Sequence, residues 1–302
     1  MKKSMLIALL LSAMLGWTAS ADAQLKKRVA VFAFEDKTDK SWHWWDGRAP
    51  GDGMADMLTT ALVKSGEYTV MERKDIAAVL DEQKLGESGA VTQESAARLG
   101  KLLGVELAVV GSVTEFGHSR QDIGGTVKGF GLGVKKQKAT VAIDVRLIST
   151  TTGEILKAEH VRKEQSSSGL AVSTREGSFN NESDFDNSIV GKATRAAIED
   201  IVTLIRENAG ETVWSGKVIL VKEGTVYFKP GQDGGVQVGD RFAVFQKGDD
   251  LIDPDTGLSL GSEERKIGLL EVTGFAGEGS RVSKAVVKAG SGIQTGDLVR
   301  LP

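Results

Sequence analysis

The sequence predicts an α+β protein, with an N-terminal αβ domain of helices on a mixed sheet and a small all-β barrel-like domain after it. Three observations support this. The run RVAVFAFE at residues 28–35 is apolar on both faces, as in a central buried strand. Apolar residues from Met54 to Leu62 recur at helical spacing. From Glu211 onward, short β-rich runs alternate with Gly/Asp turns, which favours a separate β domain.

Residues 1–23 have the pattern of a secretory signal peptide. Lys2 and Lys3 precede an apolar stretch from Leu6 to Gly16, and Ala21-Asp22-Ala23 provides a small-x-small site, so we expect cleavage after Ala23. An uncleaved membrane anchor is the alternative. It is disfavoured because the apolar stretch is shorter than the roughly 20 residues of a spanning helix. The mature chain is therefore expected to be exported.

The composition excludes several classes of exported protein. The chain has no cysteine, which excludes disulfides, thiolate metal sites and a lipid-bearing cysteine at the mature N-terminus. Removal of Lys2, Lys3 and Asp22 lowers the basic residues from 38 to 36 and the acidic residues from 41 to 40, which leaves a net charge of −4. This mild acidity gives no electrostatic basis for binding nucleic acid.

We assign residues 24–208 to the αβ domain. Gly66 stands where a C-cap glycine ends the first helix, and Thr92 is a plausible N-cap for the third. Val141 to Leu147 alternates as a half-buried strand and pairs through a turn at Thr151–Gly153 with the next strand. The remaining elements are strands at 68–73, 105–116 and 155–162, helical stripes at 76–80 and 93–103, and a helix from Ile189 to Leu204 capped by Asn187 or Ser188.

We assign residues 211–302 to the β domain, with Gly210 at the boundary. Its runs predict a closed barrel or sandwich of five to seven strands. Pro254 is expected in a turn between two of them. The runs are VWSGKVILV, TVYFK, DRFAVFQ, KIGLLEVTGF, SRVSKAVV and DLVRL.

No cofactor, metal or catalytic site is predicted. The glycines of Gly124–Gly133 resemble a phosphate cradle only weakly, because no Gly-Lys-Ser/Thr and no helix follows, and a mobile or tightly paired hairpin is favoured. His43, His118 and His160 are scattered without ligand spacing. The acidic run Asp249–Asp255 lacks the glutamate that closes a calcium loop, and Glu72-Arg73 is interpreted as a structural ion pair. These absences disfavour an enzyme.

Trp42, Trp44 and Trp45 are the candidate contact residues. Three tryptophans in a polar loop are costly to expose. One interpretation is that they pack against the edge of the domain. The other is that they form a contact surface for another subunit, a partner or the membrane interface.

The run from Gly51 to Gly117 resembles the CsgG family, the curli production assembly and transport component. The resemblance rests on GDGMADMLTTALVKSGEYTVMERKDIAAVLDEQKLGESG and AARLGKLLGVELAVVGSVTEFG. It continues through GGTVKGFGLG, VAIDVRLISTTTGEIL and GKATRAAIEDIV, and covers roughly Leu25 to Glu207. The region GVQVGDRFAVFQKGDDLIDPDTGLSLG resembles the small β domain of some family members and of flagellar assembly protein T.

The resemblance implies a periplasmic domain that self-associates into a ring. In the curli member each subunit adds two β-hairpins to an outer-membrane barrel that exports unfolded curli subunits. The corresponding segments here are 122–148 and 165–187, and residues 35–50 lie where the family has its constriction loop. The first segment carries Lys128, Lys135, Lys136 and Lys138, and the second is rich in Ser, Asn, Asp and Glu. Neither keeps the single apolar face of a lipid-facing strand.

Two functional hypotheses follow. The first is a non-enzymatic cell-envelope component that acts by oligomerisation and by binding an exported or envelope protein, in secretion or assembly at the outer membrane. The second is a soluble periplasmic adaptor that keeps the family core but forms no transmembrane pore. Both place the protein in the periplasm, without a lipid anchor.

Overall fold

The computed structural model describes residues 25–39, 43–44, 47–71, 95, 103–127, 130–168, 179, 181–254 and 259–302. Several predicted features lie outside these residues. They are the signal peptide at 1–23 with cleavage after Ala23, the Glu72-Arg73 pair, Trp42 and Trp45, and the helical stripes at 76–80 and 93–103 except for Ser95 and Leu103.

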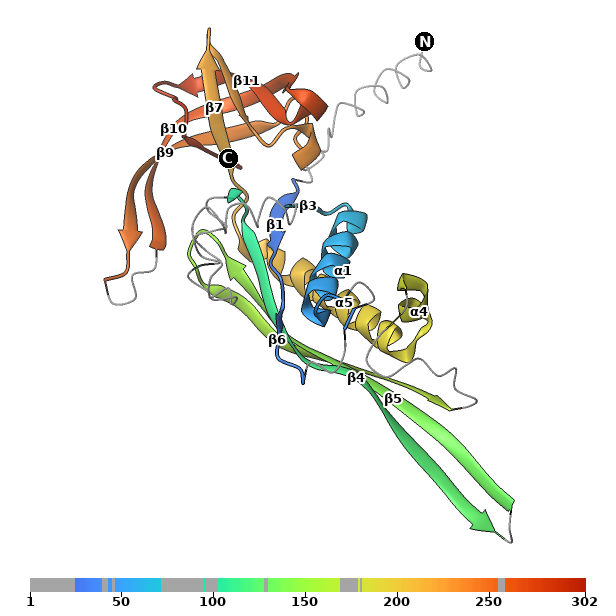
Figure 1. Ribbon diagram of the computed structural model, residues 1–302. Coiled ribbons are helices and arrows are strands. Elements are labelled where there is room, and N and C mark those ends of the chain that lie inside the picture. The colour runs from blue at the N-terminus through green and yellow to red at the C-terminus, as the bar shows by residue number, and fades with distance from the viewer. Residues whose placement is uncertain are drawn as a thin grey trace, which may run out of the picture.

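The described residues form an α+β fold in two parts, as predicted. A mixed sheet with helices on one face is followed by a closed barrel of six strands. Figure 1 shows the barrel at one end of the molecule and a long two-stranded projection at the other. Among the described residues, no helix combines the length and the apolar character needed to cross a membrane.

The sheet follows the order β3-β1-β4-β5-β6, and β2 pairs with β4. β1 is parallel to β3 and β4, whereas β4, β5 and β6 are antiparallel. The predicted strand at 28–35 is present as two strands, because residues 32–34 leave the regular ladder. The strands are β1 (Lys27–Val31), β2 (Glu35–Asp36), β3 (Tyr68–Val70), β4 (Leu107–Val127), β5 (Phe130–Ser149) and β6 (Ile155–Ser168).

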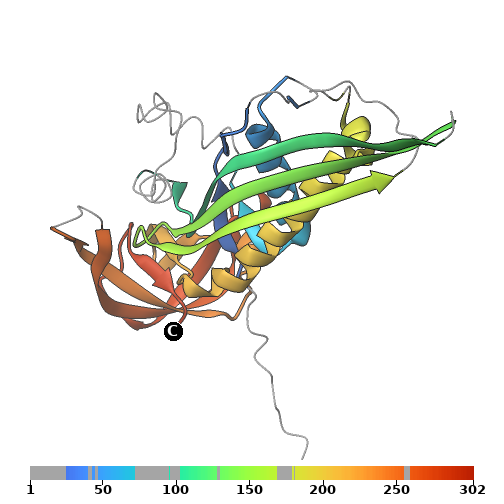
Figure 2. The same ribbon diagram turned by 90° about the horizontal axis from the view of Figure 1, so that it is seen from below.

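Two long helices cover one face of this sheet, α1 (Pro50–Ser65) and α5 (Ile189–Asn208). Figure 2 shows both helices behind the ribbon of β4, β5 and β6. Gly66 ends α1 with φ 70°, as predicted, and the Ser188 hydroxyl caps α5 by accepting from the Gly191 amide at 2.9 Å. Apolar residues of the sheet and of both helices form one buried core, which includes Val109, Ile143, Leu58 and Ile201.

The segment 165–187, where the resemblance implies a second hairpin, is described only in part. Residues 165–168 end β6, Glu182–Asn187 form the short helix α4, and residues 169–178 and 180 lie outside the described residues. α4 is capped by Asn181, whose side chain accepts a hydrogen bond from the Asp184 amide at 2.9 Å. Asn187 is therefore the last residue of α4, and Ser188 alone caps α5.

The β region is a closed barrel in the order β10-β11-β8-β7-β12-β9. Its six strands correspond to the six predicted runs, and Pro254 lies in the turn between β9 and β10, as expected. The core of the barrel includes Val226, Phe228, Phe242 and Leu270. The strands are β7 (Gly216–Lys222), β8 (Thr225–Lys229), β9 (Arg241–Ile252), β10 (Ser259–Ala276), β11 (Val282–Gly290) and β12 (Leu298–Arg300); η2 (Ala209–Glu211), η3 (Gln232–Gly234) and η4 (Glu278–Ser280) are single 3₁₀ turns.

Candidate functional site

The most prominent feature of the sheet is the β4–β5 hairpin, which extends well beyond the helices (Figures 1 and 2). The two strands pair from Leu107↔Ser149 to Val127↔Phe130. β6 pairs with β5 only as far as Lys136↔Ser168, so the outer part of the hairpin stands alone among the described strands. Gly124 and Gly133 face each other in this ladder, which confirms the paired hairpin predicted in place of a phosphate cradle.

Both edges of the β4-β5-β6 ribbon are open within the described part of the chain. β4 pairs with β1 at residues 107–109 and with β2 at residues 112–113, and no described strand lies on that edge from Glu115 onward. β6 pairs with β5 alone, so its outer edge is open along its length. Open strand edges present unpaired N–H and C=O groups and are sites where another chain can pair.

Beyond a buried apolar cluster at its base, which includes Ala108, Val110 and Ile148, the face of this ribbon opposite α1 and α5 is polar and ion-paired. Arg162 Nε bonds Glu115 at 3.1 Å, and its guanidinium also contacts Glu164. Lys138 contacts Glu164 from the other side at 2.9 Å. These contacts raise the pKa of Arg162 and lower the pKa of Glu164, chiefly through the side-chain hydrogen bonds. The ribbon therefore has an apolar face on the core and a charge-balanced face in solvent.

One row of this polar face brings together Ser112, Asp144 and His160 by strand pairing. His160 Nδ1 lies 2.6 Å from Asp144 Oδ1, a contact that the sequence spacing did not reveal. Asp144 is on the central strand of the three, so it separates the serine from the histidine. In this pairing the serine lies beside Asp144 and not beside His160, so the row lacks the geometry of a nucleophile activated by histidine. An open depression of about 460 Å³ lies over this row.

Trp44 is packed inside the αβ domain. Its side chain is 2% exposed, and its ring centroid lies 4.6 Å from that of Phe185 and 6.1 Å from that of Phe116. Gly53 of α1 packs so closely on the indole that a Cβ there would lie 2.1 Å from Trp44 Cε2. This is the packing that the domain-edge interpretation predicts, and it leaves almost none of Trp44 for a partner.

A groove of about 480 Å³ runs between α1 and the α4–α5 pair on the outer side of the helices. Trp44, Met57 and Phe185 contribute to its apolar floor. Its rim is charged but paired internally, with Arg48 on Asp56 at 2.7 Å and Arg195 on Asp186. Among the described residues, no group of three or more His, Asp or Glu side chains could hold a metal ion.

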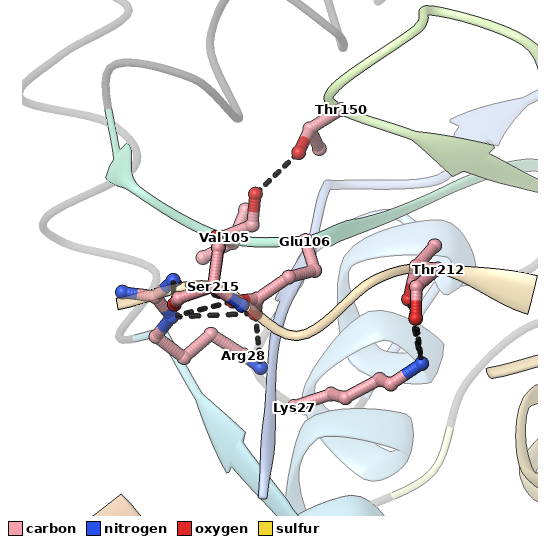
Figure 3. A network of polar contacts seen from close by, with 7 residues as sticks. All are labelled: Lys27, Arg28, Val105, Glu106, Thr150, Thr212 and Ser215. Carbon is pink, nitrogen blue, oxygen red and sulfur yellow. Dashed lines mark hydrogen bonds and ion pairs between the residues drawn. The ribbon is translucent and has the colours of Figure 1, made fainter. Parts of the chain in front are cut away.

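The two parts of the fold are joined by a polar network around Glu106 (Figure 3). Glu106 is 2% exposed and accepts from the Arg28 amide at 2.7 Å, from the Arg28 guanidinium and from the Ser215 amide at 3.4 Å. Arg28 Nη2 also donates to the Ser215 carbonyl at 2.7 Å. The connection between α5 and the barrel is therefore bound directly to the first strand of the sheet.

Lys27 binds the same connection between α5 and the barrel, at residues that precede Ser215. Its ammonium donates to the Ala209 carbonyl and to the Thr212 hydroxyl at 2.9 Å, where α5 ends. Partial burial lowers the pKa of Lys27, and the nearby Glu106 opposes that shift. The Lys26 amide donates to the Gly234 carbonyl of η3 at 2.9 Å, and Leu25 packs against the barrel core. The start of β1 thus contacts both parts of the fold.

The model for the curli production assembly/transport component CsgG matches residues 10–226, which is more than half of the chain. The chain belongs to the CsgG family. The match ends within the β7–β8 hairpin, so the resemblance of the C-terminal region to flagellar assembly protein T stays a prediction.

Two curated CsgG proteins, from Salmonella typhimurium and Salmonella typhi, are 28% identical to this chain over 113 residues. That alignment covers 35% of the chain and 41% of the curated proteins. The chain thus matches less than half the length of these CsgG relatives, and their activity is not transferred to it by the alignment alone.

Matches among solved structures include a hypothetical protein, CT253, from Chlamydia trachomatis. It is 14% identical with a TM-score of 0.38, and the match covers 61% of this chain and 97% of that protein. The PelC dodecamer from Paraburkholderia phytofirmans is 12% identical with a TM-score of 0.29, covering 59% of this chain and 86% of PelC.

Proposed function

We propose that this protein is a non-enzymatic assembly or secretion component of the bacterial cell envelope, which acts by self-association and by binding an exported or envelope protein. Membership of the CsgG family supports the envelope role. The observation that carries the mechanism is the β4-β5-β6 ribbon, which projects from the body with both edges open among the described strands.

The two open edges differ from each other, so the contact we propose is heterologous. The β4 edge of one copy would pair with the β6 edge of the next. β4 and β6 run in the same direction, because each is antiparallel to β5. A contact of this kind makes a closed ring when the rotation between copies closes. The charge-balanced face and the apolar face would each continue from one copy to the next.

Disulfide cross-linking tests this contact. Because the chain has no cysteine, the introduced cysteines are its only thiols. Ser119 on β4 and Ser166 on β6 flank Lys138 of β5 in one row. Two strand spacings of about 4.8 Å separate them, beyond the roughly 7 Å limit for a disulfide within one chain. In Ser119→Cys/Ser166→Cys, oxidation should therefore yield a ladder of linked copies on non-reducing gels. Each single variant should give no more than dimers, and a Ser291→Cys variant serves as the surface control.

A ladder in the double variant with none in the controls would support ring formation through the strand edges. If the double variant stays monomeric under oxidation at any protein concentration, the proposed edge contact is wrong. A register shifted by two residues, which keeps both side chains on one face, is covered by moving the β6 cysteine to Ser168 in a second double variant.

The second candidate function is a periplasmic adaptor that keeps the family core without a pore. Lysines at positions 128, 135, 136 and 138 in or beside the projecting hairpin favour it, because charge is costly on a lipid-facing strand. Fractionation of native cells separates the two. The transport role predicts a detergent-requiring oligomer in the outer-membrane fraction, and the adaptor predicts a buffer-soluble periplasmic protein of low oligomeric order.

A further inference from the structure

The barrel carries a second projection, formed by β9 and β10 beyond the point where they belong to the barrel wall. β12 pairs with β9 only at residues 243–245, and β11 pairs with β10 only from Gly268 onward. Residues 247–252 and 259–264 pair with each other and with no other described strand. We call residues 247–264, of which 255–258 lie outside the described residues, the β9–β10 arm. Figure 1 shows it leaving the barrel at the lower left.

The arm is acidic and carries exposed apolar side chains. Its 18 residues include six Asp or Glu and one Lys, a net charge of −5. Leu251 and Ile252 are 52% and 53% exposed near the end of β9. Adjacent residues of a strand point to opposite faces, so both faces of the arm present an apolar side chain. An isolated two-stranded ribbon is at best marginally stable in water, which favours a partner for the arm.

A basic surface with an exposed apolar side chain lies on the outside of β7, β8 and β11. Leu220 is opposite Tyr227, and Tyr227 is opposite Lys284, in a row that points outward because Val226 and Phe228 are in the core. Leu220 is 46% exposed. Four lysines surround this row, so we define the basic face as Lys217, Leu220, Lys222, Tyr227, Lys229 and Lys284. With Lys288, these three strands and the β7–β8 turn hold five Lys and one Glu, a net charge of +4.

The acidic arm and the basic face lie on opposite sides of the barrel. In the closed order β10-β11-β8-β7-β12-β9, the β9–β10 pair is directly across from the β7–β8 pair. In one molecule the two surfaces therefore cannot meet. Between two molecules they can, in a head-to-tail arrangement that leaves a free arm at one end and a free basic face at the other.

We propose that the β9–β10 arm of one copy docks on the basic face of the next copy of this chain. Leu251 would pack on Leu220 and Tyr227, and the carboxylates on the same face of the arm would face the four lysines. The arm and the strands of the basic face carry opposite net charges of nearly equal size. This complementarity identifies a second copy of the chain as the partner that docks on the basic face. This contact lies in the barrel and goes beyond the proposed function, because it stands whether or not the sheet edges of neighbouring copies pair.

Charge reversal in the full mature chain tests the contact. One variant, Lys222→Glu/Lys284→Glu, lowers the net charge of the basic-face strands from +4 to 0, and the other, Asp249→Lys/Glu263→Lys, changes the net charge of the arm from −5 to −1. Association is measured by size exclusion with light scattering at low and high salt. Each variant alone should associate about a hundredfold more weakly than the parent chain, because most of the charge attraction across the contact is then removed. An equimolar mixture should recover association, because the unchanged arm of the first variant can dock on the unchanged basic face of the second.

Lys64→Glu/Lys192→Glu on the exposed sides of α1 and α5 is the matched control, with the same change in net charge and no expected loss. A position-specific readout mixes Leu220→Cys with Leu251→Cys and adds a short bismaleimide. Only the mixed pair should be linked, and neither variant should be linked to itself. A parent chain that stays monomeric at low salt, or a mixture that recovers nothing, overturns the proposal. Equal losses in the control variant would overturn it as well.

Discussion

Glu106 and Arg28 lie 78 residues apart in the sequence and form an ion pair between the start of β4 and the start of β1. The carboxylate is almost fully buried, and the guanidinium is 20% exposed. Because both also bind the backbone of Ser215, this pair supports the sheet and the connection to the barrel together.

We predict that Glu106→Gln destabilises the protein by about 2–3 kcal/mol. Removal of one partner of a buried pair costs about 3–5 kcal/mol, and the partial exposure of Arg28 reduces that figure. The free energy of unfolding from urea titration measures the effect. Glu159→Gln is the control, because Glu159 and Lys157 form an exposed pair at 3.6 Å, and it should change the free energy by less than about 0.5 kcal/mol. Equal effects of the two substitutions would contradict the structural role of Glu106.

Trp44→Ala should lower the free energy of unfolding by about 3–5 kcal/mol, as expected for a buried aromatic side chain. Trp44→Phe should recover part of that loss, because a smaller ring still contacts Phe185. Thermal and urea unfolding of the purified protein measure both. Val63→Ala, at a position 58% exposed, is the surface control. A Trp44→Ala chain of unchanged stability but weaker association would instead favour the contact-surface interpretation.

Gly191→Ala should destabilise the protein, although alanine is the better helix former by about 1 kcal/mol. A Cβ at Gly191 would lie 1.9 Å from the Phe185 carbonyl oxygen, so α4 and α5 would have to move apart. We expect a net loss of about 1–3 kcal/mol from overpacking. Gly210→Ala provides the comparison, because a Cβ there meets nothing within 4 Å. Stabilisation by Gly191→Ala would show that the helices tolerate the separation.

The Arg206–Glu67 pair should make stability depend on pH in the acidic range. Arg206 Nη2 and Nε bond the Glu67 carboxylate at 2.8 and 2.9 Å, and this hydrogen bonding is the main cause of the lowered pKa of Glu67. A depressed carboxyl pKa contributes stability above the unfolded value of 4.5, and the contribution is lost as the pH falls through the folded pKa. The difference in stability between the parent chain and Arg206→Gln should therefore be present at neutral pH and vanish in acid. A difference that persists below both pKa values would point to packing by the arginine stem.

Local patterns in the sequence predicted much of the fold. These patterns depend on residues that are close in the sequence. The helical spacing of Leu58 and Leu62 and the glycine at 66 predicted α1 and its end, and the alternation at 141–147 predicted a strand that is part of β5. The six β runs after Glu211 predicted a closed barrel or sandwich for the same reason, and the described strands form the barrel.

Features that depend on distant pairing were not predicted. β4 was expected to end at Phe116, but it continues to Val127 because β5 returns alongside it. The β9–β10 arm was missed because Gly- and Asp-rich residues have low strand propensity, and only mutual pairing keeps them extended. The Glu106–Arg28 and His160–Asp144 contacts join residues whose spacing in the sequence carries no signal.

The contacts of Lys26 and Lys27 have a consequence for how the chain matures. Lys27 and Thr212 are 185 residues apart, and Leu25 packs into a barrel whose last strand is at residues 298–300. The start of β1 therefore obtains its partners from residues that are synthesised much later. Contacts of such high sequence separation form late and slowly. Until the barrel has formed, β1 lacks part of the surroundings that hold it, so the order of the sheet at this strand depends on the barrel.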